Sequence, residues 1–224
     1  MAIITDPKDI QIKSFRIVDS YLKDLKLPRA QKEVVKRVIH ATSELNYAGD
    51  ILFHPAALRN GLKALRDGKN IVADATMVKA GINKKLLSIF GSKAICLLNR
   101  KDVARQASRL NVTRSMVAMR KAHALMEGGI VAIGNAPTAL FELCDLVNAG
   151  KAKPSLIIGM PVGFVGAKES KNKLRTLNIP YITNRTRRGG SSATAACVNA
   201  LLKIAERKKM GGLCNAYLRR NTAS

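Results

Sequence analysis

Acidic residues are scarce in this sequence. It has 15 Asp and Glu against 39 Lys and Arg, which gives a formal net charge of +24 over 224 residues. An excess of this size calls for an anionic partner or produces a strongly self-repelling surface. Nucleic acid, an anionic membrane and a polycarboxylate are the classes of partner that the charge leaves open.

Long hydrophobic runs are also missing. No apolar run approaches the roughly 20 residues that a membrane-spanning helix needs. The first nine residues contain no basic stretch followed by an apolar block, so we expect no secretory signal. These absences predict a cytoplasmic protein without a membrane partner.

Patterns that bind metals are absent as well. Structural zinc sites use closely spaced pairs of Cys or His ligands. The chain has no Cys-x-x-Cys and no His-x-x-x-His spacing among its four cysteines and three histidines, which are Cys96, Cys144, Cys197, Cys214, His40, His54 and His123. We therefore expect no metal bound by the protein and interpret the cysteines as buried free thiols.

Aromatic residues are few, with 5 Phe, 4 Tyr and no Trp. Proteins that bind single-stranded nucleic acid stack the bases on aromatic side chains, and no aromatic-rich strand occurs among the basic residues here. We therefore expect no nucleic-acid partner. A basic nucleic-acid-binding module stays open as an alternative on the charge alone.

What the chain does contain is enough apolar residues, 47%, for a single domain over 1–224 with a sizeable core. Apolar positions at three- and four-residue intervals predict a helix over 10–25, and a second helix is expected from Pro28. Residues 1–50 should thus form a helical N-terminal part.

From residue 70 onward, short apolar runs alternate with amphipathic stretches. The runs predict strands at 71–73, 94–98, 130–133, 156–158 and 181–182, and the stretches between and after them predict helices at 101–110, 114–126, 138–148, 168–177 and 192–206. Such alternation predicts an α/β fold: a mainly parallel sheet of about five strands, covered by helices on both faces, over 70–206. Residues 207–224 should form a basic C-terminal appendage.

The segments after these strands are rich in small and cationic residues. Ligands of open α/β sheets bind at the carboxyl ends of the strands, where glycine lets backbone N–H groups approach a ligand. The segment 159–166 with Lys168 fits neither of the common phosphate-binding glycine motifs, so an anion site and a plain strand-to-helix turn are about equally supported. Its position at a strand end favours the site.

A second segment combines Arg185, Arg187 and Arg188 with Gly189-Gly190-Ser191. Ser191 is expected to cap the following helix, whose N-terminus carries a partial positive charge that suits carboxylates or phosphates. A solvated basic turn is the alternative.

His40 is the candidate for proton transfer. Its ordinary pKa lies nearest neutrality, and its place at the end of a predicted helix can expose it to a cleft. A structural histidine is the alternative, and His54 and His123 compete with it. Asp74, at a strand end, is the one acid considered for the site, with capping of a turn as the other explanation.

Several motifs together resemble the precorrin-8X methylmutase family of cobalamin biosynthesis. They are His40-Ala-Thr, Asp74-x-x-Met77 with Ala80-Gly-Ile82, Thr113-Arg-Ser115, the block 132–140, Gly159-x-Pro-Val-Gly-Phe-Val-Gly166 followed by Ala-Lys-Glu-Ser170, and Arg188-Gly-Gly-Ser191. The resemblance runs in order through nearly the whole chain.

The resemblance implies an isomerase that moves a methyl group from C11 to C12 of a corrin precursor. The substrate would be precorrin-8X or its cobalt form, and the product hydrogenobyrinate or cobyrinate. The family's active-site histidine matches His40, whose implied role is to protonate a ring nitrogen without any external cofactor. The family is also homodimeric, with sites near the subunit interface, and a corrinoid carrier without catalysis is a further alternative.

Substrate-binding residues also follow from the resemblance. Ser14 matches a ligand-contacting serine, Arg114 a carboxylate clamp, and the loop positions are Thr76, Asn135, Gly163, Arg187, Arg188, Gly189, Gly190 and Ser191. The chain departs from the family pattern at Tyr21, Asn46 and Thr186. Thr186 stands where a glycine usually precedes the arginine pair, and a β-branched residue resists positive φ.

Overall fold

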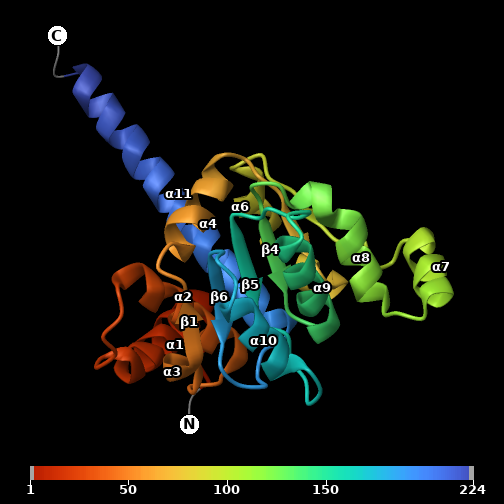
Figure 1. Ribbon diagram of the computed structural model, residues 1–224. Coiled ribbons are helices and arrows are strands. Elements are labelled where there is room, and N and C mark those ends of the chain that lie inside the picture. Colours follow the sequence, from red (N-terminus) through yellow and green to blue (C-terminus); the bar gives the residue numbers. More distant parts are fainter. Residues whose placement is uncertain (1–2, 222–224) are drawn as a thin grey trace.

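The computed structural model describes residues 3–221 and the side chains of residues 3–209 (Figure 1). Its centre is a six-stranded sheet with the order β1-β6-β5-β4-β2-β3, in which β1 alone runs antiparallel to its neighbour. The strands are β1 (Ile51–Phe53), β2 (Ile71–Ala73), β3 (Ala94–Ile95), β4 (Ile130–Ile133), β5 (Leu156–Gly159) and β6 (Tyr181–Asn184). The predicted mainly parallel α/β fold is confirmed.

Helices cover both faces of this sheet. Those packed on one face are α1 (Pro7–Leu22), α2 (Arg29–Thr42), α3 (Tyr47–Asp50), α4 (Ala57–Arg66), α5 (Thr76–Gly81), α6 (Lys84–Ser88) and α11 (Ser191–Asn221). Those associated with the other face are α7 (Lys101–Leu110), α8 (Arg114–Ala122), the short 3-10 helix η1 (His123–Met126), α9 (Pro137–Asn148) and α10 (Ala167–Arg175).

Alternate residues of each central strand enter the two cores. In β4, Ile130 and Ala132 pack with α2 and α11, whereas Val131 and Ile133 pack with α8 and α9. All four are fully buried. A central strand that is covered on both faces favours apolar side chains at every position. The sequence of such a strand is therefore a continuous apolar run.

Two strands differ from the prediction. The edge strand β1 was not foreseen, because three residues are too few to show a period of two. It pairs with β6 in the register Ile51↔Asn184 to Phe53↔Ile182. The predicted strand over 94–98 is confirmed only at Ala94–Ile95, since the chain then turns toward α7.

The N-terminal helices lie beside β1 and β6 at one end of the sheet (Figure 1). Asp6 caps α1 by accepting hydrogen bonds from the N–H groups of Lys8 and Asp9. The predicted apolar stripe of α1 is only half used for packing, because Val18 and Leu22 are buried while the rest of it stays exposed. Exposed apolar side chains on this helix are Ile10, Ile12, Ile17 and Tyr21.

The long helix α11 includes residues 207–221 of the segment for which a basic C-terminal appendage was predicted. It begins at Ser191 and continues through residue 207 to Asn221, leaving the body of the protein at the end remote from the β6–α11 turn (Figure 1). Residues 222–224 of the predicted appendage lie outside the described residues. Ser191 is the first helical residue, and Gly190 occupies the cap position, with its carbonyl accepting from Thr194 N at 3.0 Å.

Within residues 3–221, no helix combines the length and the apolar character needed to cross a membrane.

Candidate active site

His40 lies in the last turn of α2 and is held by two residues of α1. Its Nδ1 is 2.8 Å from Ser14 Oγ, and its ring centroid is 4.8 Å from that of Phe15. Ser43 then ends α2 in a left-handed conformation with φ 54°. Because Ser14 occupies Nδ1, Nε2 is the ring nitrogen left for a ligand.

The surroundings of His40 lower its pKa. Partial burial is the larger cause, and the cation of Arg37, one turn earlier on α2, is the second. The Arg37 guanidinium carbon lies 5.7 Å from the centroid of the Phe15 ring, so the two groups that flank His40 are themselves in contact. An imidazolium in this position gives up its proton more readily than a free histidine does.

An apolar groove of about 650 Å³ opens at His40. Polar groups reach it from Lys13, Ser14, His40 and Ser43. Its apolar walls are Ile3, Ile4, Ile10, Ile17, Val18, Tyr21, Ile39 and Leu45. Ile17 and Tyr21 are 51% and 58% exposed, so the groove presents apolar surface to a ligand or a second protein surface.

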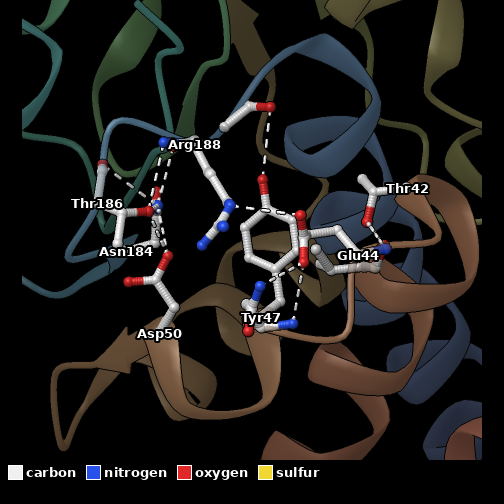
Figure 2. Close-up of polar contacts among 10 residues, drawn as sticks. Thr42, Glu44, Tyr47, Asp50, Asn184, Thr186 and Arg188 are labelled. Atoms are coloured by element: carbon white, nitrogen blue, oxygen red, sulfur yellow. Dashed lines mark hydrogen bonds and ion pairs between the residues drawn. The ribbon is translucent and has the colours of Figure 1, made fainter.

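Residues 184–190, here called the arginine turn, connect β6 to α11 and meet the segment that follows His40 (Figure 2). Arg188 Nε lies 3.3 Å from Glu44 Oε2. The Tyr47 hydroxyl donates to the carbonyl of Gly189 at 3.4 Å. The C-terminal part of the arginine turn therefore contacts Glu44, whose neighbours Ser43 and Leu45 line the histidine groove.

The arginine turn also contacts the loop after β5, as the position of both at strand ends predicts. Gly190 N donates to Met160 O at 2.9 Å, and Gly163 N donates to Arg187 O at 3.3 Å. A Cβ on Gly189, whose φ is +156°, would lie 2.2 Å from Met160 O, so only glycine allows this approach. Four predicted positions, Gly163, Arg187, Gly189 and Gly190, are thus brought together.

A second, cationic cavity of about 980 Å³ lies between α10 and the arginine turn. Its lining is Lys168, Asn172, Arg175, Arg185, Thr186, Arg187 and Arg188. Five of these seven residues are cationic and none is acidic, so the cavity is a favourable place for carboxylate or phosphate groups.

Seven of the ten predicted substrate-binding residues line neither cavity. Four of them, Gly163, Gly189, Gly190 and Ser191, lie in or next to the arginine turn and the loop that it contacts, and the other three are Thr76, Arg114 and Asn135. Thr76 begins α5 and accepts a hydrogen bond from Asn99 Nδ2 at 3.2 Å, while Arg114 is exposed at the start of α8. The side chain of Asn135 is also exposed, and its N–H donates to Asp74. Their contact with a ligand stays a prediction.

Asp74 has the structural role that was considered for it. Its carboxylate is buried and accepts from the N–H groups of Gly134, Asn135 and Ala136 at 3.0, 2.9 and 2.8 Å. Burial raises its pKa, and these three hydrogen bonds oppose the rise. The carboxylate fixes the turn after β4 by accepting these three hydrogen bonds.

The sequence reasoning missed the polar residues beneath the arginine turn. Asp50, Lys171 and Asn184 are buried there and bind its backbone. The sequence contains one indication that Lys171 is buried. Lys171 lies on the same face of the predicted helix as Ala167 and Leu174, and an apolar helix face is normally turned toward the core. Thr186 shows no strain, because the non-glycine residues with positive φ in the described part of the chain are Ser43 and Asn111.

Comparison with known proteins agrees with this architecture. The family model described as precorrin-8X methylmutase matches residues 9–204. A cobalt-precorrin-8 methylmutase of Priestia megaterium is 44% identical over 204 residues, which cover 91% of each chain. A precorrin-8X methylmutase of Pseudomonas aeruginosa is 42% identical over 200 residues, covering 88% of this chain and 96% of the relative.

A solved structure of the precorrin-8X methylmutase from Thermus thermophilus is similar to this one throughout. It superimposes with a TM-score of 0.82 at 37% identity, covering 88% of this chain and 96% of the other. The chain therefore belongs to the precorrin-8X methylmutase family, a family of isomerases of cobalamin biosynthesis.

Proposed function

We propose that this protein moves a methyl group from C11 to C12 of a corrin precursor. The reaction would convert precorrin-8X, or its cobalt form, to hydrogenobyrinate or cobyrinate. Relatives with both substrate names resemble this chain to a similar degree, 44% and 42%, so both substrates belong in the test. The supporting observation is His40 in an apolar groove beside a cationic turn.

The geometry suits the chemistry of such a substrate. A tetrapyrrole has apolar ring faces and a rim of acetate and propionate carboxylates. The groove offers apolar walls for a ring face, and the arginine turn offers cations for the rim. Binding would hold the ring with one nitrogen near His40, which supplies most of what an intramolecular migration needs.

His40 would supply one proton. In the imidazolium, Nδ1–H donates to Ser14 Oγ and Nε2–H points to the ligand, so Nε2 is the atom that protonates a ring nitrogen. The methyl group then migrates within the protonated ring, and the proton returns to Nε2 afterwards. The migrating carbon never leaves the substrate, so no external cofactor enters this scheme.

Protonation of His40 and binding of the substrate would support each other. Burial and Arg37 disfavour the imidazolium in the free protein. Carboxylates of a bound polyanion favour it, since an opposite charge stabilises a cation. The histidine would thus be charged when the substrate is present and neutral when it is absent.

We also propose that the protein is a homodimer with its sites near the subunit interface. Exposed apolar side chains of α1 support this, because Ile10, Ile17 and Tyr21 line the His40 groove and are exposed on the single chain. Sedimentation of Ile17→Asp should then show a monomer, whereas the unchanged protein sediments as a dimer.

The function is tested by anaerobic incubation with precorrin-8X or its cobalt form, followed by the visible spectrum. His40→Ala should lower kcat by about 10²- to 10⁴-fold, the usual contribution of a positioned proton donor. His123→Ala is the matched control, because His123 is exposed on η1. Binding without turnover by the unchanged protein would indicate a corrinoid carrier, and equal activity of His40→Ala and His123→Ala would remove the role of His40.

A further inference from the structure

Two buried charged side chains, Asp50 and Lys171, lie beneath the arginine turn, and the proposed proton transfer uses neither of them. Asp50 is 6% exposed and Lys171 is fully buried. Placing a charge inside a protein is costly unless the group is hydrogen-bonded or paired. What these two groups bind therefore indicates why they are there.

Lys171, on α10, binds the backbone of the arginine turn. Its Nζ donates to Thr186 O at 2.8 Å and to Arg188 O at 2.5 Å. Burial lowers the pKa of Lys171 to about 8, while Asp50 opposes that shift, so the ammonium is charged at neutral pH. The two carbonyls flank Arg187, and one cation thereby fixes the backbone on both sides of it.

Asp50, on α3, binds the same turn from a different element (Figure 2). Its carboxylate accepts from Arg185 N at 2.8 Å, from Thr186 Oγ1 at 2.6 Å and from Asn184 Nδ2 at 3.0 Å. Asn184 Nδ2 also lies 2.9 Å from Arg188 O. Side chains from α3, α10 and β6 thus converge on a stretch of five residues.

The cationic cavity lies on the outer side of this turn. Arg185, Arg187 and Arg188 line it together with Lys168 and Arg175 of α10. Binding an anion with long side chains costs entropy, and a backbone that is already fixed lowers this cost. A loosened turn would still carry its arginines but would hold them in many arrangements.

We propose that Lys171 and Asp50 are positioning residues for anion recognition: they lock the arginine turn from inside so that Arg187 and Arg188 present a preformed site to carboxylates of the substrate. This rests on the proposed function for the identity of the substrate. The residues act through the arginines and do not touch the substrate.

The test separates positioning from mere folding. Lys171→Met removes the donor to both carbonyls, and it should also lower the stability of the fold, because the carbonyls and the buried Asp50 carboxylate lose the ammonium. Thr186→Val keeps the shape of Thr186 and removes the hydrogen bond that its hydroxyl donates to Asp50, together with those that it accepts from Asn184 Nδ2 and Arg188 N within the turn. Lys173→Met is the matched control, since it removes one positive charge from the same helix at a side chain that pairs with Asp145.

The measurements are kcat and KM for precorrin-8X, with citrate binding by calorimetry as a readout independent of turnover. Both variants of the turn should raise KM by about 10-fold, as loss of one charge-assisted hydrogen bond would, and should weaken citrate binding. Their kcat and its pH profile should match those of Lys173→Met, because His40 is unchanged.

A purely structural role would give fewer active molecules, and hence a lower kcat at the same KM. That result, or a KM equal to that of Lys173→Met, overturns the proposal. If Lys171→Met does not fold, Thr186→Val decides by the same criteria. If the unchanged protein binds citrate but converts no corrinoid, the proposed function fails, while weaker citrate binding by the variants still supports the positioning role.

Discussion

Ser14→Ala tests whether Ser14 acts on the substrate or on His40. The family resemblance implies a serine that contacts the ligand, whereas the structure places Ser14 Oγ 2.8 Å from His40 Nδ1. The substitution removes this hydrogen bond and little else, because alanine keeps the helix and the Cβ. Ser14 is half-buried, so water can replace the hydroxyl only in part.

The size of the effect follows from the strength of that bond. A part-buried hydrogen bond between neutral groups contributes about 0.5 to 1.5 kcal/mol, and up to about 3 kcal/mol when one partner is charged. The bond is charge-assisted while His40 is the imidazolium and is an ordinary hydrogen bond once the proton has been delivered, so its loss lowers the fraction of substrate-bound molecules in which His40 is charged. The difference predicts a kcat lower by about two- to tenfold, with little change in KM.

The assay measures kcat and KM separately for Ser14→Ala and for Ser20→Ala. Ser20 lies on the same helix and donates to Ile17 O, so its loss should leave both constants as they are. A higher KM with an unchanged kcat in Ser14→Ala would refute the reasoning and return Ser14 to the role of a substrate contact.

Three further predictions concern other parts of the site. Asp74→Ala should lower the free energy of unfolding by about 3 to 5 kcal/mol, because it leaves three N–H groups without an acceptor. Denaturant unfolding measures this free energy. The control is Asp67→Ala, which removes an exposed ion-pair residue and should change the free energy of unfolding by less than about 1 kcal/mol. Gly189→Ala should displace the loop after β5 and lower both stability and activity, whereas Gly49→Ala, where the new Cβ meets nothing within 4 Å, should do neither; equal melting temperatures would contradict this. Arg37→Gln removes a cation that lowers the pKa of His40, so the pKa of His40 should rise. Because His40 acts as the proton donor, kcat/KM should then stay high up to a higher pH before it falls. A pH profile that is unchanged, or shifted to lower pH, would show that Arg37 does not act on His40.

The fold was predictable to the extent that its elements have a period. The central strands are buried on both faces and therefore appear as apolar runs, and α7 begins and ends at the predicted residues, Lys101 and Leu110. The edge strand β1 was not predictable, since its three residues take their strand form from pairing with β6. The length of α11 was also missed, because a helix was predicted over 192–206 and a separate appendage over 207–224, whereas the helix continues to Asn221.

The site divides in the same way. The position of His40 near the end of a helix could be predicted, but its contacts could not, since Ser14 lies 26 residues away on another helix. The framework of the arginine turn depends on contacts between residues 50, 171 and 184–188, which no local pattern reveals. Thr186 shows the limit of the rule that a β-branched residue is unsuitable where the family has glycine. The backbone at Thr186 does not adopt a positive φ, and its hydroxyl binds Asp50.

The scarcity of acidic residues acquires a structural meaning from these contacts. Two of the few carboxylates, Asp50 and Asp74, are buried and hold turns at strand ends by accepting backbone N–H groups. Glu142 forms a two-pronged pair with Arg120 between α8 and α9, and Glu33 binds Arg207 between α2 and α11. These four acidic residues accept hydrogen bonds that hold elements of the fold together, and the lining of the cationic cavity contains no acidic residue. The cavity beside the arginine turn is therefore lined by five cationic residues and no acidic one, and Arg188 is a member of this set that already pairs with a carboxylate of the protein, that of Glu44.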